Sequence, residues 1–195
     1  MITSRFSRAV SLAIQAHDGD VRKGTTIPYI SHPLAVASIA LEHGADEDQA
    51  IAALLHDAIE DGGRDYIALI RDQFGERVLA LVEGCTDGIP DATGQKADWH
   101  TRKTRYLEHL LHTHDDVLLV SGADKLHNAR SIVADLQSIG EVVFERFSVK
   151  KADTLWYYQS LADIFERRRA PMATVLRRVV HEMREMDSPQ DQSAF

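Results

Sequence analysis

The stretch DEDQAIAALLHDAIED, residues 46–61, combines a hydrophobic helical pattern with a dense group of ionisable side chains. Its apolar positions between 51 and 59 extend almost all the way round a helical wheel, which is typical of a buried helix. The same stretch ends with His56, Asp57, Glu60 and Asp61. Isolated carboxylates are too costly to bury without partners or a metal ion, so the pattern predicts a metal site.

Helical spacing gives these four ionisable residues a definite arrangement. Residues four apart on a helix lie one above the other, so Glu60 stacks with His56 and Asp61 with Asp57. We therefore expect one continuous helix over 46–61, with a His-Asp layer for the metal. A Glu-Asp layer follows about 5.4 Å along the axis. Carboxylates beside a cation-bound water suit metal-activated hydrolysis, because a nearby carboxylate can take or relay a proton.

Two further ligands are expected from other parts of the chain. His32 comes directly before a proline that suits the first turn of a helix, and Asp124 lies in an otherwise apolar stretch. With His56 and Asp57 they make two imidazoles and two carboxylates. Such a mixed set suits Mn²⁺ or another first-row divalent ion better than a structural, cysteine-type zinc site.

Helical spacing dominates the whole chain, and alternating strand patterns are weak. We therefore predict an all-α fold, a helical bundle of roughly eight to ten helices. One domain is expected over residues 1–187, with a disordered tail over 188–195. The expected helices cover residues 4–17, 33–43, 46–61, 65–74, 76–84, 98–112, 115–139, 150–169 and 171–186, and the longest loop covers 86–97.

Composition limits the classes of partner and compartment. The 195 residues carry a net charge of −8, which argues against nucleic acid or an anionic membrane as a partner. A small anionic nucleotide held by a local basic patch stays compatible with that charge. The single cysteine, Cys85, excludes an internal disulfide and fits the reducing cytoplasm. Composition does not decide whether the protein forms a homo-oligomer, so this possibility stays open.

Three blocks of sequence occur in a fixed order: Arg22-Lys23 with PYISHP at 28–33, HDAIED at 56–61, and ADKLHN at 123–128. This H…HD…D pattern resembles the HD-domain phosphohydrolases. The extended form resembles the hydrolase domain of the RelA/SpoT proteins, and the length resembles stand-alone small alarmone hydrolases of the Mesh type. The resemblance covers roughly residues 5–165, and it implies a single HD-domain bundle.

The resemblance also implies a reaction, the Mn²⁺-dependent removal of the 3′-pyrophosphate from guanosine 3′,5′-bis(diphosphate) or its adenosine relatives. The attacking group would be a metal-activated water. No synthetase domain fits in this length, so hydrolysis alone is expected. The implied metal ligands are His32, His56, Asp57 and Asp124, the implied catalytic pair is Glu60 and Asp61, and the implied substrate contacts are Arg22, Lys23 and Asn128.

Three departures from the family pattern leave the base of the substrate open. The segment 23–32 is one residue longer, Gly62 stands where threonine is usual, and Ser131 stands where threonine is frequent. Guanosine and adenosine alarmones and NADPH therefore all remain candidate substrates. Two other functions also stay open, a general nucleotide phosphohydrolase (a nucleotidase or an NADPH 2′-phosphatase) and a catalytically silent nucleotide-sensing module.

The expected helix 98–112 carries Trp99, Arg102, Lys103 and Tyr106 after the longest loop. In one interpretation its aromatic side chains pack on the bundle and its charges are solvated. In the other, the helix is a lid that brings Arg102 or Lys103 over the 5′ phosphates of the substrate.

Overall fold

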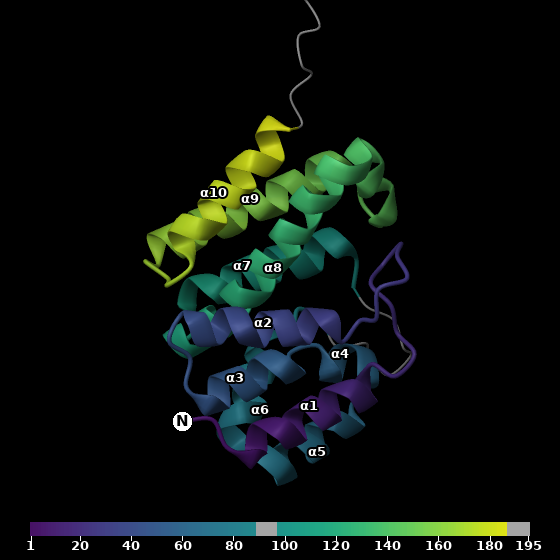
Figure 1. Cartoon of the computed structure of the whole chain (residues 1–195). Coiled ribbons are helices and arrows are strands. Elements are labelled where there is room, and N and C mark those ends of the chain that lie inside the picture. Colours follow the sequence, from purple (N-terminus) through teal and green to yellow (C-terminus); the bar gives the residue numbers. More distant parts are fainter. Residues whose placement is uncertain (89–96, 187–195) are drawn as a thin grey trace, which may run out of the picture.

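The computed structural model describes residues 1–88 and 97–186, and these residues form a stack of helices (Figure 1). The all-α prediction is confirmed: the described residues contain no β-strand, and one isolated bridge joins Val21 to Pro28. In chain order the helices are α1 (Ser4–Ala16), α2 (Ser31–Glu42), α3 (Glu47–Leu55), α4 (Ala58–Gly62), α5 (Asp65–Phe74), α6 (Glu76–Cys85), α7 (Trp99–His112), α8 (Asp115–Ile139), the 3₁₀ helix η1 (Gly140–Arg146), α9 (Lys151–Arg167) and α10 (Ala173–Glu185).

Helix α8 forms the centre of the molecule. It packs against α2, α3 and α6 on one side and against α10 and η1 on the other. Every residue from 117 to 126 is buried, as expected for a helix that is apolar on all sides. A polar side chain on this stretch, such as Asp124, is therefore held inside the protein by its neighbours.

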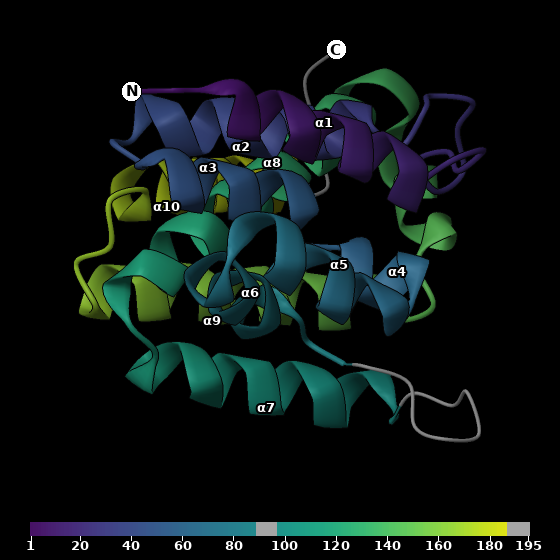
Figure 2. The same cartoon turned by 90° about the horizontal axis from the view of Figure 1, so that it is seen from below.

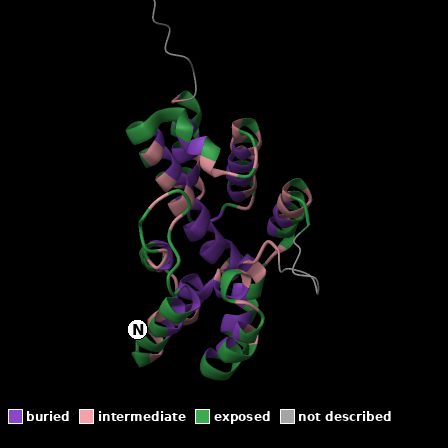
Figure 3. Ribbon diagram, turned by 90° about the vertical axis from the view of Figure 1, so that its right-hand side faces the viewer, coloured by how far each residue is buried: buried purple, intermediate pink, exposed green. Residues whose placement is uncertain are grey.

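The remaining helices are arranged in layers around α8. Helices α1, α2 and α3 lie together, whereas α9 and α10 pair with each other (Figure 1). Helix α7 lies on the outside and packs on α9 (Figure 2). Buried residues gather where the helices face one another, and exposed residues cover the outer faces (Figure 3).

The prediction of one continuous helix over 46–61 is wrong. Helix α3 ends at Leu55 and α4 begins at Ala58, so that His56 and Asp57 lie in the turn between them. The His56 Nδ1 atom lies 2.8 Å from the Ala53 carbonyl oxygen. That oxygen is the acceptor that the Asp57 N–H would use in an uninterrupted α-helix. The start of α3 agrees with expectation, because Asp46 is its N-cap.

Several other boundaries differ from the expected ones. Helix α2 begins at Ser31, two residues before the proline expected to start it, and the 3₁₀ helix η1 was not expected.

The predicted tail 188–195 and most of the predicted loop 86–97 lie outside the described residues. The organisation as one domain stays a prediction. No helix in the described part of the chain has the length and apolar character needed to cross a membrane.

Leu161 on α9 tests the packing of the core, because its side chain is 0% exposed. We expect Leu161→Ala to lower the free energy of unfolding by about 2–5 kcal/mol, through lost burial and the cavity left behind. The matched control is Leu69→Ala on α5, where the leucine is 36% exposed, with an expected loss of about 1 kcal/mol or less. Urea denaturation followed by circular dichroism measures both, and equal losses would contradict the packing described.

Candidate active site

The four predicted metal ligands come together at the junction of α2, α8 and the turn between α3 and α4. The His32 Nε2 atom lies 3.2 Å from His56 Nε2 and 3.2 Å from Asp124 Oδ1. The Asp57 Oδ2 atom lies 3.0 Å from His56 Nε2 and 3.6 Å from His32 Nε2. Ligand atoms of His32, His56 and Asp124 all lie within 4.8 Å of one another. We refer to these four side chains as the His-Asp cluster.

The hydrogen bonds of the two histidines show whether their inward nitrogens suit a cation. Since a carbonyl oxygen only accepts, His56 Nδ1 carries the proton that it donates to Ala53, which leaves Nε2 as the ring nitrogen that would bind a cation. His32 Nδ1 lies 2.8 Å from His127 Nδ1. Burial, with His32 and Arg22 nearby, lowers the pKa of His127 to about 4, and burial also lowers the pKa of His32, so one neutral ring donates to the other through Nδ1. In the tautomer in which His32 Nδ1 is the donor, His32 Nε2 presents a lone pair inward, and this is the tautomer that a cation would select.

The electrostatics of the His-Asp cluster also favour a positive charge. Burial alone lowers the pKa of His56, but the carboxylates of Asp57 and Asp124 outweigh it and raise that pKa well above its ordinary value. Two imidazole nitrogens and two carboxylates facing one centre are donors that fit a first-row divalent cation. The residues present thus fit a metal of the kind that the sequence predicts.

Three members of the His-Asp cluster, His32, Asp57 and Asp124, are held by further side chains. The Tyr29 hydroxyl donates to Asp57 Oδ2 at 2.6 Å. Asp124 accepts at both oxygens, from Asn128 Nδ2 at 2.5 Å and from Lys125 Nζ at 2.6 Å. Burial would lower the pKa of Lys125, but the Asp124 carboxylate raises it well above the ordinary value, so this buried amine is a cation. Such outer contacts orient metal ligands and tune their basicity.

A pocket of about 680 Å³ adjoins the His-Asp cluster. It is lined by Tyr29, His127 and Asn128, the same residues that contact the cluster from outside. Every other predicted site residue lines this pocket as well: Glu60, Asp61, Arg22, Lys23, Arg102 and Lys103. The structure thus brings the predicted ligands, acid pair and basic residues into one place.

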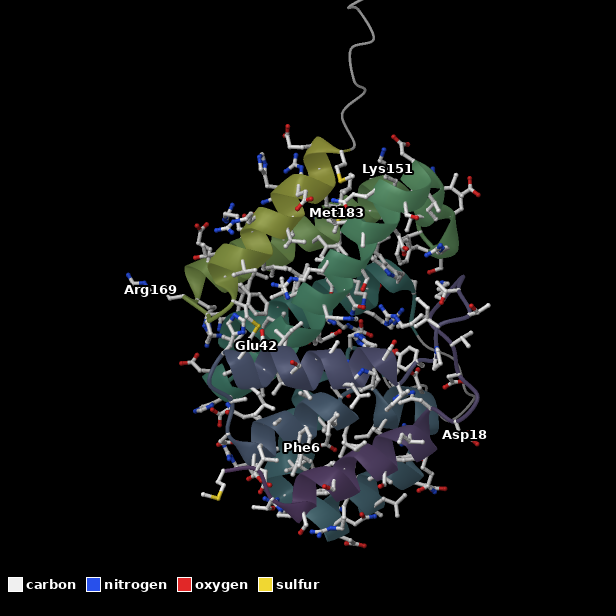
Figure 4. The ribbon with its side chains drawn as sticks, in the orientation of Figure 1. Phe6, Asp18, Glu42, Lys151, Arg169 and Met183 are labelled. Atoms are coloured by element: carbon white, nitrogen blue, oxygen red, sulfur yellow. The ribbon has the colours of Figure 1, made fainter. Side chains whose placement is uncertain are left out.

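The loop between α1 and α2 carries Arg22 and Lys23 to the pocket. In both views this loop lies on the same side of the molecule as α4 (Figures 1 and 2), and Asp18 marks its outer edge (Figure 4). The Arg22 guanidinium donates to Asn128 Oδ1 at 2.8 Å and lies 5.6 Å from the centre of the Tyr29 ring. The side chain of Arg22 is therefore fixed before any substrate binds.

The same loop folds as a tight turn, in which the Arg22 N–H donates to the Ile27 carbonyl at 2.8 Å. Gly24 lies in this turn with φ +71°, a conformation that favours glycine. A Cβ at Gly24 would lie 2.6 Å from Arg146 Cδ, so the loop also packs closely on η1. The extra residue of this segment is thus accommodated in an ordered turn.

Helix α7 places Arg102 and Lys103 in the wall of the pocket, and neither is a solvated surface charge. Both pair with Asp87, whose side chain is 8% exposed. The aromatic side chain of Trp99 packs on Trp156 and Tyr157 of α9. Asp87 was not predicted as a site residue, because it lies in a stretch whose pattern indicates only a loop.

The residues that orient the His-Asp cluster were also missed. Tyr29 and His127 belong to the motif blocks, but their spacing gives no sign of which cluster member each one contacts. Lys125 follows Asp124 directly and resembles a surface charge in sequence. The one available signal was its position in an otherwise apolar stretch, which indicates burial and hence a need for a partner.

Tyr29→Phe should weaken metal binding about 10-fold or more, because losing an outer hydrogen bond to a metal ligand commonly has an effect of 10–100-fold. Isothermal titration of metal-free protein with MnCl₂ measures the dissociation constant. The matched control, Tyr66→Phe on α5, removes a tyrosine hydroxyl elsewhere in the protein and should keep the wild-type dissociation constant. Unchanged affinity in Tyr29→Phe would show that the Asp57 carboxylate is not held through this contact.

Comparisons with known proteins place this arrangement in a family. Residues 9–149 match the family described as HD domain. The chain is 39% identical over 129 residues to a "Probable GTP pyrophosphokinase" of Mycobacterium leprae, covering 66% of this chain and 16% of that protein. It is also 39% identical over 127 residues to "Guanosine-3′,5′-bis(diphosphate) 3′-pyrophosphohydrolase MESH1" of Xenopus tropicalis, covering 64% and 67%. The chain thus spans less than one fifth of the long relative and about two thirds of the short one.

Solved structures share the helical arrangement. The lmo0812 protein of Listeria monocytogenes EGD-e has a TM-score of 0.65 and 30% identity, and the match covers 76% of this chain and 96% of that one. A metazoan SpoT ortholog, described as hydrolysing ppGpp, has a TM-score of 0.73 over 93% of this chain, and its 23% identity supports the fold alone. The match over residues 9–149, together with the relative of similar length, shows that the chain belongs to the HD-domain family.

Proposed function

We propose that this chain is a metal-dependent pyrophosphohydrolase that removes the 3′-pyrophosphate from guanosine 3′,5′-bis(diphosphate) or its adenosine counterpart. The observation that carries the proposal is the His-Asp cluster beside a pocket lined by both acidic and basic side chains. Relatives named as (p)ppGpp hydrolases, among them the one from Xenopus tropicalis, support the choice of substrate.

The members of the His-Asp cluster, His32, His56, Asp57 and Asp124, would hold one divalent cation. Hydrolases of this family depend on a metal, and we propose Mn²⁺ because the donor set mixes imidazole nitrogen with carboxylate oxygen. When bound, such a cation supplies Lewis acidity and lowers the pKa of a coordinated water. Tyr29 holds Asp57 and His127 contacts His32, whereas Asn128 and Lys125 both hold Asp124. His56 is held by the Ala53 carbonyl.

The basic residues of the pocket would neutralise the negative charge of the substrate's phosphate groups. Arg22 and Lys23 line one part and Arg102 and Lys103 another, so that phosphate groups at two positions of a nucleotide can both be neutralised. Arg22 is already oriented by Asn128, which reduces the ordering needed on binding.

The acidic pair provides the proton transfer. Glu60 and Asp61 line the pocket from α4, within the element that directly follows two members of the His-Asp cluster. In the reaction, a water oxygen bonds to the phosphorus next to the 3′ oxygen, and the bond from that phosphorus to the 3′ oxygen breaks. One carboxylate accepts a proton from the water, and the acid pair passes a proton to the leaving 3′ oxygen, which gives pyrophosphate, a free 3′ hydroxyl and the original charge of the pair.

The substrate assay compares guanosine and adenosine 3′-pyrophosphates, NADPH and nucleoside monophosphates, each with MnCl₂ and with excess chelator. We expect pyrophosphate release from at least one 3′-pyrophosphorylated nucleotide, and none once the chelator has removed the metal. Release of phosphate from NADPH or monophosphates alone would contradict the proposal in favour of a general phosphohydrolase. Nucleotide binding without any turnover would favour a sensing module.

Glu60→Gln should lower kcat about 100- to 10,000-fold, because it removes a proton-transfer group and keeps the shape of the side chain. Steady-state kinetics with the best substrate measure this loss, and metal content is measured in parallel to show that the His-Asp cluster is intact. The matched control is Glu76→Gln, the same change at a carboxylate of α6 that pairs with Arg71. A kcat within about threefold of wild type in Glu60→Gln would remove Glu60 from the mechanism.

A further inference from the structure

One carboxylate lies between the two basic residues that α7 contributes to the pocket. Asp87 Oδ1 pairs with Arg102 Nη1 at 2.6 Å, and Asp87 Oδ2 pairs with Lys103 Nζ. Consecutive residues on an α-helix diverge by roughly 100°. The two side chains leave the helix in different directions, and both reach Asp87 because its carboxylate lies between them and offers one oxygen to each.

Each cation also has a second contact. Arg102 Nε donates to the Ala97 carbonyl at 3.1 Å, and Lys103 Nζ lies 4.9 Å from the centre of the Tyr157 ring. The backbone beside Asp87 makes room for this arrangement: a Cβ at Gly88 would lie 2.7 Å from Arg102 Cδ. The two side chains are thus confined from both sides, and the confinement depends on Asp87.

Asp87 also supports the charge of Lys103. Burial lowers the pKa of Lys103, and the buried cation Lys125 lowers it further, whereas Asp87 acts in the opposite direction. The pKa of Asp87 is itself low, because Lys103, Lys125 and Arg102 together outweigh the effect of its burial. One anion with two cations leaves a net positive charge in this wall of the pocket.

We propose that Asp87 is a positioning residue that holds Arg102 and Lys103 together as one binding group for phosphate. The inference rests on the proposed function, since its ligand is the 5′ diphosphate of the nucleotide substrate. Asp87 acts through the two cations and touches no reacting atom. It keeps them oriented before the substrate arrives, which reduces the loss of side-chain entropy on binding.

Asp87→Asn should raise KM about tenfold and leave kcat within about twofold, because the interaction serves ground state and transition state alike. The assay uses the full chain with MnCl₂ and the best 3′-pyrophosphorylated substrate, and melting temperatures are recorded beside it. Asp87→Glu keeps the negative charge, so its KM should rise less than the KM of Asp87→Asn. Glu166→Gln, the same kind of change at a carboxylate paired with Arg177 outside this pocket, should leave KM unchanged.

A double-mutant cycle separates positioning from a merely structural role. In the Arg102→Met/Lys103→Met background, adding Asp87→Asn should change KM less than about twofold, because Asp87 has lost the groups through which it acts. An equal rise of KM in both backgrounds would overturn the proposal, and so would a KM that is unchanged or lowered in Asp87→Asn alone.

If Asp87→Asn does not fold, Gly88→Ala provides a second test. Its Cβ displaces Arg102, so this variant should also raise KM. An unchanged KM in Gly88→Ala would overturn the proposal.

Binding of guanosine 5′-diphosphate, measured by calorimetry with MnCl₂, tests the inference without turnover. Tighter binding by wild type than by Asp87→Asn, by about tenfold, supports the positioning role even if no 3′-pyrophosphate is hydrolysed and the proposed function fails. If wild type and Asp87→Asn both hydrolyse the substrate, with the same KM and the same affinity for guanosine 5′-diphosphate, the proposed function stands and the positioning role of Asp87 is overturned. Absence of both turnover and binding in the wild type overturns both.

Discussion

The hydrogen bond between His56 Nδ1 and the Ala53 carbonyl has two consequences on which the site depends. It occupies the acceptor that would continue α3, so the chain turns before α4. It also fixes the proton on Nδ1 and directs Nε2 toward His32 and Asp57. The same contact thus lies at the end of a helix and orients a side chain of the His-Asp cluster. The acid pair on α4 is consequently displaced from the straight helical line through α3.

Buried charge in this protein is arranged so that each charged group has an opposite partner. Asp124 lies inside the apolar part of α8 and is held by Lys125, while Asp87 compensates the cations of α7. Unpaired, any of these groups would be strongly destabilising in the interior. The pairing extends from the His-Asp cluster to the residues of α7 in the pocket wall, and it keeps a site with so many ionisable groups compatible with a folded core.

The helical fold and the residues of the His-Asp cluster could be predicted because both depend on local patterns in the sequence. Apolar spacing indicated the buried α8, and the charged residues within apolar stretches indicated His56, Asp57 and Asp124 as residues with a special role. The break after Leu55 could not be predicted, because the apolar pattern continues through it and the cause is one side-chain hydrogen bond. The role of Asp87 depends on partners 15 and 16 residues away, across a segment whose pattern indicates only a loop.

The pocket wall contributed by α9 has a consequence for how substrate preference can diversify. The family match ends at residue 149, whereas Thr154, Tyr157 and Tyr158 line the pocket from beyond that point. The His-Asp cluster and the acid pair lie entirely within the matched region. Part of the pocket wall thus comes from a stretch of the chain that lies beyond the family match. Substitutions at these three side chains would reshape this part of the pocket and leave every residue of the His-Asp cluster unchanged.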